Sequence, residues 1–270
     1  MRLVAATLTV LLATVGLSGD ARPTDAPYTL LQFNICGNAC SSGGDGIVNA
    51  LAGAVQHRRP FAVTLNEVCE NQFARLAAEL PAYRGHFDPT GPKCRNGAPY
   101  GNAVLMRGSS LSVIGSWMLP AVIFEEDRRL LCVRSGEVTV CVTHLSVEES
   151  NREGQIAAIA TVLSGLSGPL VLAGDFNLDP SDPRLDPLYQ RYDEVDNGDR
   201  TWLNEPAGAD VRNEDTFNRH KFDYIFLSVP DWSTTGAHAD DPVGGLSDHD
   251  ALWATATLRP TTPTVPIAHP

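Results

Sequence analysis

The stretch PLVLAGDFN, residues 169–177, joins an apolar run to a polar end and decides the fold class. Residues 170–173 are all apolar, and a short apolar run between proline and glycine favours a strand over a helix. Asp175 and Asn177 follow directly, at the end of a strand, where a side chain can enter a cleft. Taken alone, this ending is also compatible with an ordinary turn, because Asp, Asn and Gly dominate turns.

Similar runs recur along the chain. Their Val, Ile, Leu and Phe content, with Gly, Pro and Asn at their ends, predicts strands at residues 28–35, 61–68, 101–107, 111–119, 129–135, 138–146, 221–228 and 250–258. Helices are predicted at residues 47–57, 72–80 and 148–166, the last from its helical apolar period. Because strands outnumber helices and helices separate only some of them, the pattern predicts an α/β (α+β) fold of two packed sheets flanked by helices.

The domain organisation is predicted from the two ends and the composition. Residues 1–26 carry one early cation, an apolar run too short for a membrane span and then small residues, which predicts a secretory signal peptide. One domain is expected over 27–258, followed by a disordered Pro/Thr-rich tail at 259–270. The polar stretch 178–219 is long for a loop and suggests a functional surface.

The charge balance argues against a non-specific nucleic-acid-binding protein. With 20 basic and 32 acidic residues the formal net charge is −12, so the average surface repels polyanions. An enzyme whose site holds a metal ion is still compatible with this balance. Local cations such as Arg128 and Lys221 are expected to supply positive potential at such a site.

The six cysteines of a predicted exported chain suggest disulfides, although their number leaves the connectivity open. Cys36 and Cys40 bracket a short loop. Cys132 and Cys141 would face each other if residues 130–142 form a hairpin with a two-residue turn that begins with glycine. Cys69 and Cys94 then remain by elimination. A zinc site is the competing interpretation, but the sequence contains no C-x-x-C pair.

Carboxylate, amide and imidazole side chains stand at the ends of most predicted strands: Asn34, Glu67, His144, Asp175, Asn177, Asp223, Asp248 and His249. Mg²⁺ takes oxygen ligands and needs only one or two protein carboxylates. Hydrolysis of a phosphodiester requires a deprotonated water and a stabilised leaving oxygen, and a histidine oriented by a carboxylate is a competent base near neutral pH. The set therefore fits metal-assisted hydrolysis.

Each of these residues also has a structural interpretation. Glu67 is compatible with a surface charge before a helix, and Asn34 with a residue that holds its own loop. A lone histidine at a strand end, such as His144, is more often a hydrogen-bonded core residue. Single residues therefore do not decide between a site and ordinary turns.

The order of the motifs does decide. The chain contains, in this order, FNI (33–35), NEV (66–68), YGNAVLMR (100–107), THLS (143–146), GDFN (174–177), FDYIF (222–226) and SDH (247–249). This series strongly resembles the endonuclease/exonuclease/phosphatase superfamily of deoxyribonuclease-I-like enzymes, and the chain looks like a secreted bacterial-type member. The resemblance implies a four-layer sandwich, with two mixed sheets between helices and the site at the edge of the sheets.

The resemblance also implies roles for the strand-end residues. Glu67 would be the principal ligand of Mg²⁺, with Mn²⁺ or Ca²⁺ as alternatives, aided by Asn34 and Asp248. His249, oriented by Asp223, would activate the attacking water or stabilise the phosphoryl charge.

The remaining roles concern the phosphate. His144 would contact the phosphate and assist the leaving group, while Asp175 and Asn177 would position the nucleophile and a phosphate oxygen. Weaker candidates for phosphate contact are Tyr100, Asn102 and Arg128.

The substrate is expected to be a phosphodiester, with nucleic acid ahead of phospholipid. A sphingomyelinase or phospholipase C is the alternative, and it would expose an aromatic docking loop to which Trp117, Trp202 and Trp232 are candidates. A non-catalytic binding protein on the same fold is a third interpretation, disfavoured because every core site position carries a chemically competent residue. A secreted monomer without a stable protein partner is expected.

Overall fold

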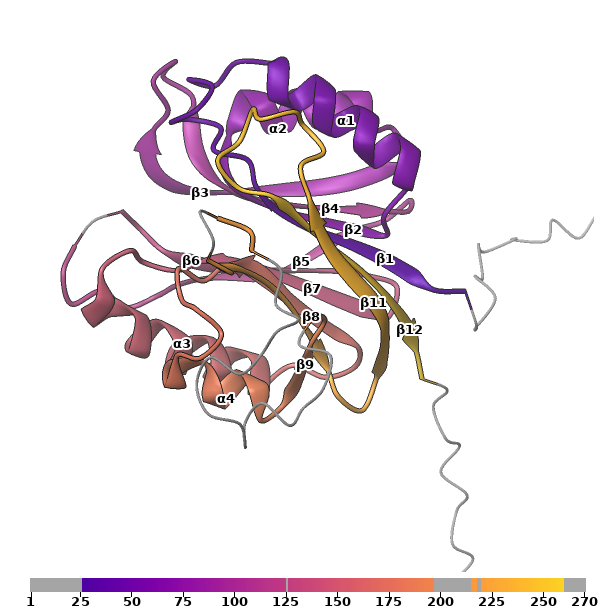
Figure 1. The fold of residues 1–270 in the computed structure, drawn as a ribbon, viewed down its shortest axis with the longest axis vertical. Helices are drawn as coiled ribbons and strands as arrows, with labels where there is room; N and C mark the ends of the chain where they lie inside the picture. Colours follow the sequence, from indigo (N-terminus) through magenta and orange to yellow (C-terminus); the bar gives the residue numbers. More distant parts are fainter. Residues whose placement is uncertain (1–25, 125, 197–214, 218–219, 260–270) are drawn as a thin grey trace, which may run out of the picture.

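Two six-stranded sheets pack against each other in this computed structural model, which describes residues 26–124, 126–196, 215–217 and 220–259 (Figure 1). The first sheet has the order β11-β12-β1-β2-β4-β3, with β1 (Tyr28–Asn34), β2 (Ala62–Cys69), β3 (Tyr83–Lys93), β4 (Pro99–Arg107), β11 (Trp232–Asp240) and β12 (Ala251–Leu258). The second has the order β5-β6-β7-β8-β10-β9, with β5 (Ser112–Met118), β6 (Arg129–Ser135), β7 (Val138–His144), β8 (Leu170–Asp175), β9 (Tyr192–Glu194) and β10 (Asp223–Ser228).

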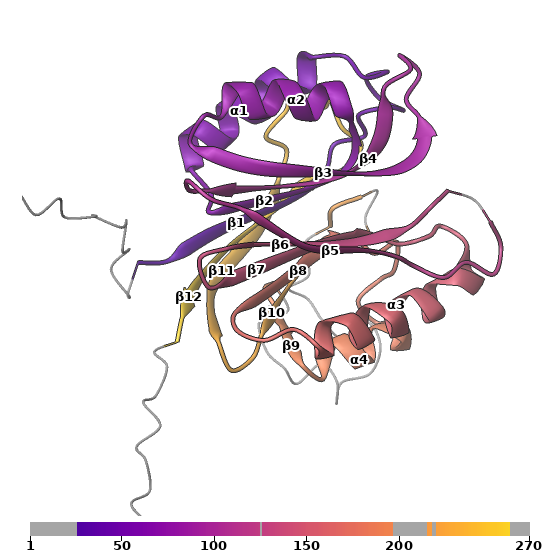
Figure 2. The same cartoon turned by 180° about the vertical axis from the view of Figure 1, so that it is seen from behind.

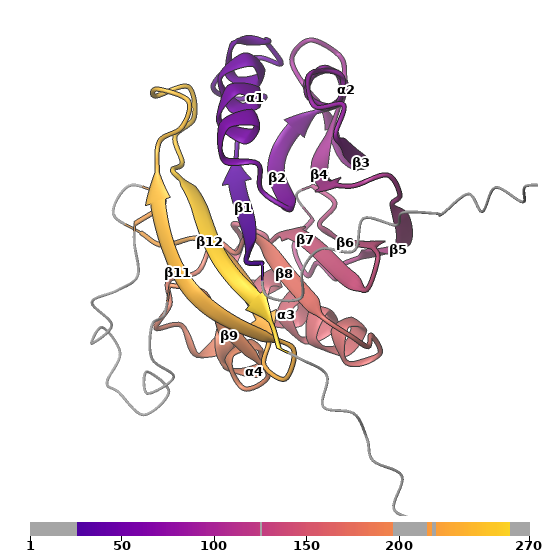
Figure 3. The same ribbon diagram turned by 90° about the vertical axis from the view of Figure 1, so that its right-hand side faces the viewer.

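Helices cover the outer face of each sheet. α1 (Gly46–Arg58) and α2 (Glu70–Glu79) lie over the first sheet. α3 (Glu149–Ser164), α4 (Asp186–Tyr189) and the short 3-10 helix η1 (Pro183–Leu185) lie over the second (Figure 2). The side view shows the resulting order of layers, helices–sheet–sheet–helices (Figure 3). The predicted four-layer α/β sandwich is therefore confirmed, and α1, α2 and α3 end within two residues of their predicted bounds.

The core explains why the central strands read as nearly continuous apolar runs. All seven residues of β7 are buried. Val140 and Val142 face the core between the two sheets together with Leu252, whereas Cys141 faces the outer core under α3 with Ile159. Strands buried on both faces lose the alternation of apolar and polar residues that a half-exposed strand shows.

Three strands, β3, β9 and β11, are not in the predicted set. All three lie at a sheet edge, and β3 and β11 each carry exposed polar residues and a glycine in a sequence that resembles a loop. Edge strands tolerate such residues because one side of the strand needs no partner. The polar stretch 178–219 is also not one loop, because it contains η1, α4 and β9. Its residues 197–214 and 218–219, and the predicted leader up to 25 and tail from 260, lie outside the described residues.

The three predicted disulfides are confirmed as Cys36–Cys40, Cys69–Cys94 and Cys132–Cys141, so no cysteine is free for zinc. The β6–β7 hairpin closes as expected, with Ser135 paired to Val138 around Gly136, whose φ is 59°. None of the helices in the described residues is long and apolar enough to span a membrane.

Candidate active site

Strand register brings the predicted site residues to one end of the two sheets. In the first sheet β1 and β2 are parallel, and Asn34 pairs with Asn66. In the second sheet β8 lies between parallel β7 and antiparallel β10, and Asp175 therefore pairs with both His144 and Asp223. Where the two sheets meet, Asn34 of β1 lies 3.0 Å from Asp175 of β8, although the two residues are 141 positions apart.

Glu67 reaches the site through a bulge in β2. The pairing of β2 with β4 is interrupted between Leu65 and Val68, and Glu67 has a φ of 58°, in the left-handed region. This conformation is costly for a residue with a side chain, and such backbone strain clusters at functional sites. Burial raises the pKa of the Glu67 carboxyl group, and a hydrogen bond from Asn34 opposes that rise.

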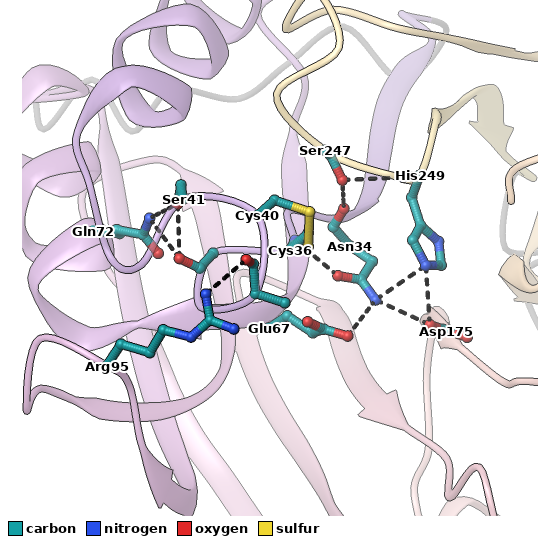
Figure 4. Close-up of a disulfide and its surroundings, with 12 residues drawn as sticks. Asn34, Cys36, Cys40, Ser41, Glu67, Gln72, Arg95, Asp175, Ser247 and His249 are labelled. Atoms are coloured by element: carbon teal, nitrogen blue, oxygen red, sulfur yellow. Dashed lines mark hydrogen bonds and ion pairs between the residues drawn. A yellow bond between two sulfur atoms is a disulfide. The ribbon is translucent and has the colours of Figure 1, made fainter.

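Asn34 links the two sheets (Figure 4). Its Nδ2 donates to Glu67 Oε1 at 3.1 Å and to Asp175 Oδ2 at 3.0 Å, and lies 3.4 Å from His249 Nε2. Its Oδ1 accepts the N–H of Cys36 at 3.0 Å. The amide nitrogen of Asn34 therefore faces the carboxylates and its oxygen faces the following loop, so Asn34 would offer oxygen to a metal ion only after its amide turned over.

His249 and Asp223 form a buried pair. His249 Nδ1 lies 2.7 Å from Asp223 Oδ2, and the other oxygen of Asp223 accepts a hydrogen bond of 3.1 Å from Gln32. Burial lowers the pKa of His249, but the carboxylates of Asp223, Asp175 and Asp248 outweigh it and raise that pKa to about 9. The imidazole is therefore protonated at neutral pH.

Asp175 lies between two histidines whose pKa values are shifted in opposite directions. Its Oδ2 is 3.5 Å from His144 Nε2 and 3.7 Å from His249 Nε2. Burial and the nearby Asp223 carboxylate raise the pKa of Asp175 to about 7. Burial, with Arg128 and His249 close by, holds the pKa of His144 well below 6.5, so this histidine is neutral. Neighbouring groups thus carry a cation, a neutral imidazole and a carboxyl group that titrates near neutral pH.

The phosphate-contact candidates surround this centre. Asn177, in a left-handed conformation with φ 50°, donates its N–H to Asp175 Oδ1 and its side chain to Leu145 O. Asn102 is buried and accepts a hydrogen bond from Asn66 at 2.8 Å. Burial and the charge of Glu67 raise the pKa of Tyr100.

Two further predicted residues, Arg128 and Asp248, act on the site through their charges. Arg128 is buried, pairs with Glu126 at 3.0 Å, and acts electrostatically on Glu67 and His144. Asp248 is exposed and influences the pKa values of both Glu67 and His249.

The expectation that Lys221 supplies positive potential at the site is wrong. Lys221 is 2% exposed, and its Nζ lies 2.7 Å from Asp196 and 3.4 Å from Glu194. Two carboxylates therefore neutralise this cation inside the protein.

Sequence reasoning missed three residues that hold the site together. Asn66 is fully buried, accepts from Gln32 and the N–H of Asp175, and donates to Asn102 and Thr143 O. Gln32 is also fully buried and holds Asp223. Ser247 donates to Asn34 O and accepts the N–H of His249. Gln32 could have been found as a polar residue within the apolar run of β1. Asn66 and Ser247 could have been found because they belong to the NEV and SDH motifs.

The donor set fits a hard divalent cation. Among the described residues, the only group of three close potential ligands is Cys36, Cys40 and Asp248, and the disulfide consumes its two sulfurs. Glu67 is a mostly buried carboxylate whose raised pKa reflects incomplete compensation of its charge. A cation held by one carboxylate and several waters, as Mg²⁺ often is, matches this arrangement.

The packed sheets and the histidine–carboxylate site at their common end define a deoxyribonuclease-I-like α/β sandwich. The chain belongs to the endonuclease/exonuclease/phosphatase family, whose model matches residues 31–249. The predicted resemblance is thus confirmed, and the fold is that of a family of phosphodiesterases, nucleases and phosphatases.

Solved structures support the fold. The human Nocturnin catalytic domain with bound sulfate is 19% identical, with a TM-score of 0.66 over 86% of this chain and 94% of that one. TDP2 of D. rerio, complexed with a single-strand DNA product, is 17% identical, with a TM-score of 0.65 over 86% and 100%. An endonuclease/exonuclease/phosphatase from Bacteroides vulgatus is 19% identical, with a TM-score of 0.64 over 87% and 100%. No curated protein matches the sequence.

Proposed function

We propose that the protein is a secreted phosphodiester hydrolase that depends on a divalent metal ion and acts as an endonuclease. The observation that carries this proposal is the placement of Asp175 Oδ2 between His144 Nε2, at 3.5 Å, and His249 Nε2, at 3.7 Å. His249 is in turn held by Asp223 at 2.7 Å. A row of neighbouring titratable side chains whose pKa values differ strongly is typical of acid–base catalysis.

The proton chemistry follows from the charge states of the side chains. Asp175, with its pKa near 7, accepts a proton from the attacking water, since a base is most effective when its pKa lies near the working pH. Protonated His249 donates a hydrogen bond to a phosphoryl oxygen and stabilises the charge that develops there. Neutral His144 contacts the phosphate on the other side of Asp175, and Asn177 orients a further oxygen.

Glu67 is the principal metal ligand in this proposal, with Asp248 on the solvent side. Mg²⁺, or Mn²⁺ or Ca²⁺ in its place, would supply Lewis-acid polarisation of the phosphate and stabilise the leaving oxygen. Asn34 orients the Glu67 carboxylate through its 3.1 Å hydrogen bond. Tyr100, Asn102 and Arg128 line the same region and are the proposed phosphate contacts.

Nucleic acid is the preferred substrate. The relative TDP2 is complexed with single-strand DNA, and an acidic protein can bind such a polyanion where a metal ion and Arg128 make the site locally positive. A cavity of about 460 Å³ opens beside Asn177, lined also by Arg152, Ser181 and Phe222. Asp179 and Asp182 also line this cavity.

Secretion is proposed from the cysteines and the leader sequence. Three disulfides persist in an oxidising compartment and are rare in the cytosol. The anatomy of residues 1–26 agrees with export, and a monomer is expected.

One observation favours the second candidate, a phosphodiesterase acting on phospholipid. Val122 and Phe124 are each 80% exposed and Ile123 is 50% exposed, on the loop that leads to Arg128. The buried side chain of Asn151 holds the backbone of this loop at Val122 and Ile123, so its apolar side chains point outward. Of the predicted docking tryptophans, Trp232 is buried and Trp117 is partly buried against the core, while Trp202 lies outside the described residues.

An activity panel separates these possibilities. Purified protein is stripped with EDTA and assayed on plasmid DNA, RNA, sphingomyelin vesicles and bis(p-nitrophenyl) phosphate, each with Mg²⁺, Mn²⁺ and Ca²⁺. Metal-dependent nicking of DNA is the expected result. Faster turnover of vesicles that is lost in Phe124→Ser would favour the phospholipid candidate, and no hydrolysis in any arm would leave a binding protein on this fold.

A further inference from the structure

The disulfide Cys36–Cys40 closes a short loop directly after Asn34 (Figure 4). Cys36 has a φ of 47°, a left-handed conformation that directs the following residue, Gly37. The N–H of Cys36 donates to Asn34 Oδ1 at 3.0 Å, and this bond sets which end of the amide faces Glu67 and Asp175.

The next residue of the loop holds Glu67. Gly37 donates its N–H to Glu67 O at 2.9 Å, at the residue whose backbone is in the left-handed region. A Cβ at Gly37 would lie 2.6 Å from that carbonyl oxygen and 2.1 Å from Gln72 Oε1. Only glycine permits this approach, so two consecutive N–H groups hold the proposed metal ligand Glu67 and Asn34, the residue that orients it.

Gln72 fastens the loop from the other side. Its Nε2 lies within 3.3 Å of Gly37 O and 3.0 Å of both Ser41 Oγ and Gly44 O, while its Oε1 accepts the N–H of Cys69. The side chain is 1% exposed, so its hydrogen bonds are shielded from competing water. The loop is thus tied to the start of α2 as well as to Asn34.

The three disulfides differ in their surroundings. Cys40 is exposed, and the Cys36 and Cys40 sulfurs lie within 4.8 Å of the Asp248 carboxylate. Cys132 and Cys141, in contrast, are fully buried in the second sheet. Cys69 and Cys94 are buried in a small cluster with Tyr100. The Cys36–Cys40 loop bonds Asn34 through the Cys36 N–H and Glu67 through the Gly37 N–H.

We infer that the disulfide-closed loop of residues 36–40 is a positioning element whose intact link sets the metal affinity of the site. This inference rests on the proposed metal site at Glu67. Without the link, the left-handed turn at Cys36 is free to relax, and the two N–H groups no longer hold Asn34 and Glu67 together. Residues that orient metal ligands typically change metal affinity by about 10- to 100-fold when they are altered.

The test compares two variants that each lack one of the three disulfides. Cys36→Ser/Cys40→Ser opens the loop, and Cys132→Ser/Cys141→Ser opens a buried link away from Glu67. Serine is used instead of reduction because two free thiols beside Asp248 would create a site for zinc. Mg²⁺ binding is measured by titration calorimetry and Mn²⁺ binding by electron paramagnetic resonance, with circular dichroism as a check of folding.

The Cys36/Cys40 variant should bind Mg²⁺ about tenfold or more weakly. Its Mg²⁺ activation constant should rise by the same factor, with kcat at saturating Mg²⁺ changed only a few-fold, whereas a general loss of structure would lower kcat as well. If that variant does not fold, Gln72→Leu, which keeps the disulfide, should weaken Mg²⁺ in the same direction.

Unchanged Mg²⁺ affinity in the variant that folds, or equal weakening in the Cys132/Cys141 variant, overturns the inference. Wild-type protein that binds no metal, or that binds it as well after Glu67→Gln, refutes the proposed metal site itself and the inference with it. If the wild type binds Mg²⁺ through Glu67 and the Cys36/Cys40 variant binds it equally well, the inference is refuted and the proposed metal site is not.

Discussion

The substitution Asp223→Asn tests the charge state on which the proposed chemistry depends. The amide keeps the shape of the carboxyl group and an oxygen for Gln32, whose Nε2 lies 3.1 Å from Asp223 Oδ1. It places an N–H donor opposite His249 Nδ1, where the wild type has an acceptor at 2.7 Å. An imidazolium cannot accept that hydrogen bond, so the substitution selects neutral His249 with its proton on Nε2.

The size of the effect follows from the pKa of His249, which is about 9 instead of the usual 6.5. This difference corresponds to about 3 kcal/mol in favour of the protonated form, at about 1.4 kcal/mol for each pH unit. Loss of the Asp223 charge leaves burial as the main influence, so the pKa should fall to 6.5 or below. At pH 7.5 at most about a tenth of the molecules would then be protonated. Because only the protonated form stabilises the phosphoryl charge in the proposed mechanism, kcat should fall about tenfold or more.

Two measurements check this prediction. The His249 Cε1–H resonance of metal-free protein is titrated by NMR, and kcat is measured on bis(p-nitrophenyl) phosphate at saturating Mg²⁺. Because the folded pKa is raised, wild-type His249 contributes stability that is complete below pH 6.5 and is lost as the pH rises through about 9. That loss of stability should be absent from Asp223→Asn.

The matched control is Asp231→Asn, which lies just beyond the other end of β10 and bonds Ser228. It should leave both the resonance and kcat unchanged. A His249 pKa that stays near 9 in Asp223→Asn, or a kcat within a few-fold of wild type with an unchanged thermal midpoint, would refute the reasoning.

Three further predictions concern the metal, the base and the core. Glu67→Gln should weaken Mg²⁺ binding by about tenfold or more, because the charged ligand is lost, and an unchanged calorimetric titration would remove Glu67 from the ligands. Asp175→Asn should lower kcat by about 10²- to 10⁴-fold and abolish the acidic limb near pH 7 of the rate profile, and a persisting limb would identify another base. Leu252→Ala, fully buried between the sheets, should lower the free energy of unfolding by about 2–5 kcal/mol in urea without changing Mg²⁺ affinity, and a cost below about 1 kcal/mol would contradict the described packing.

Much of the fold is readable in the chain because its information is local. The central strands are apolar on both faces. A glycine turn between two such apolar runs predicts the hairpin in which Cys132 and Cys141 are linked. After their first residues, Tyr83 and Trp232, the edge strands β3 and β11 are mostly exposed or partly buried and polar, so their sequences carry no comparable signal. Lys221 shows the same limit, since a lysine near a site motif gives no sign that two buried carboxylates neutralise it.

The sequence by itself determined which side chains stand at strand ends, in which order, and therefore the family and the candidate chemistry. Only the tertiary structure decided how they meet. Asn34 and His249 are 215 positions apart, and sheet register brings their side chains within 3.4 Å. The left-handed turn at Glu67 and the hydrogen bond from the Gly37 N–H to the Glu67 carbonyl oxygen also depend on packing between segments distant in sequence. Local sequence patterns encode the hydrophobic period of each strand or helix and the residues of its turns. The distances between titratable side chains, which set their pKa values, arise only when the two sheets pack against each other.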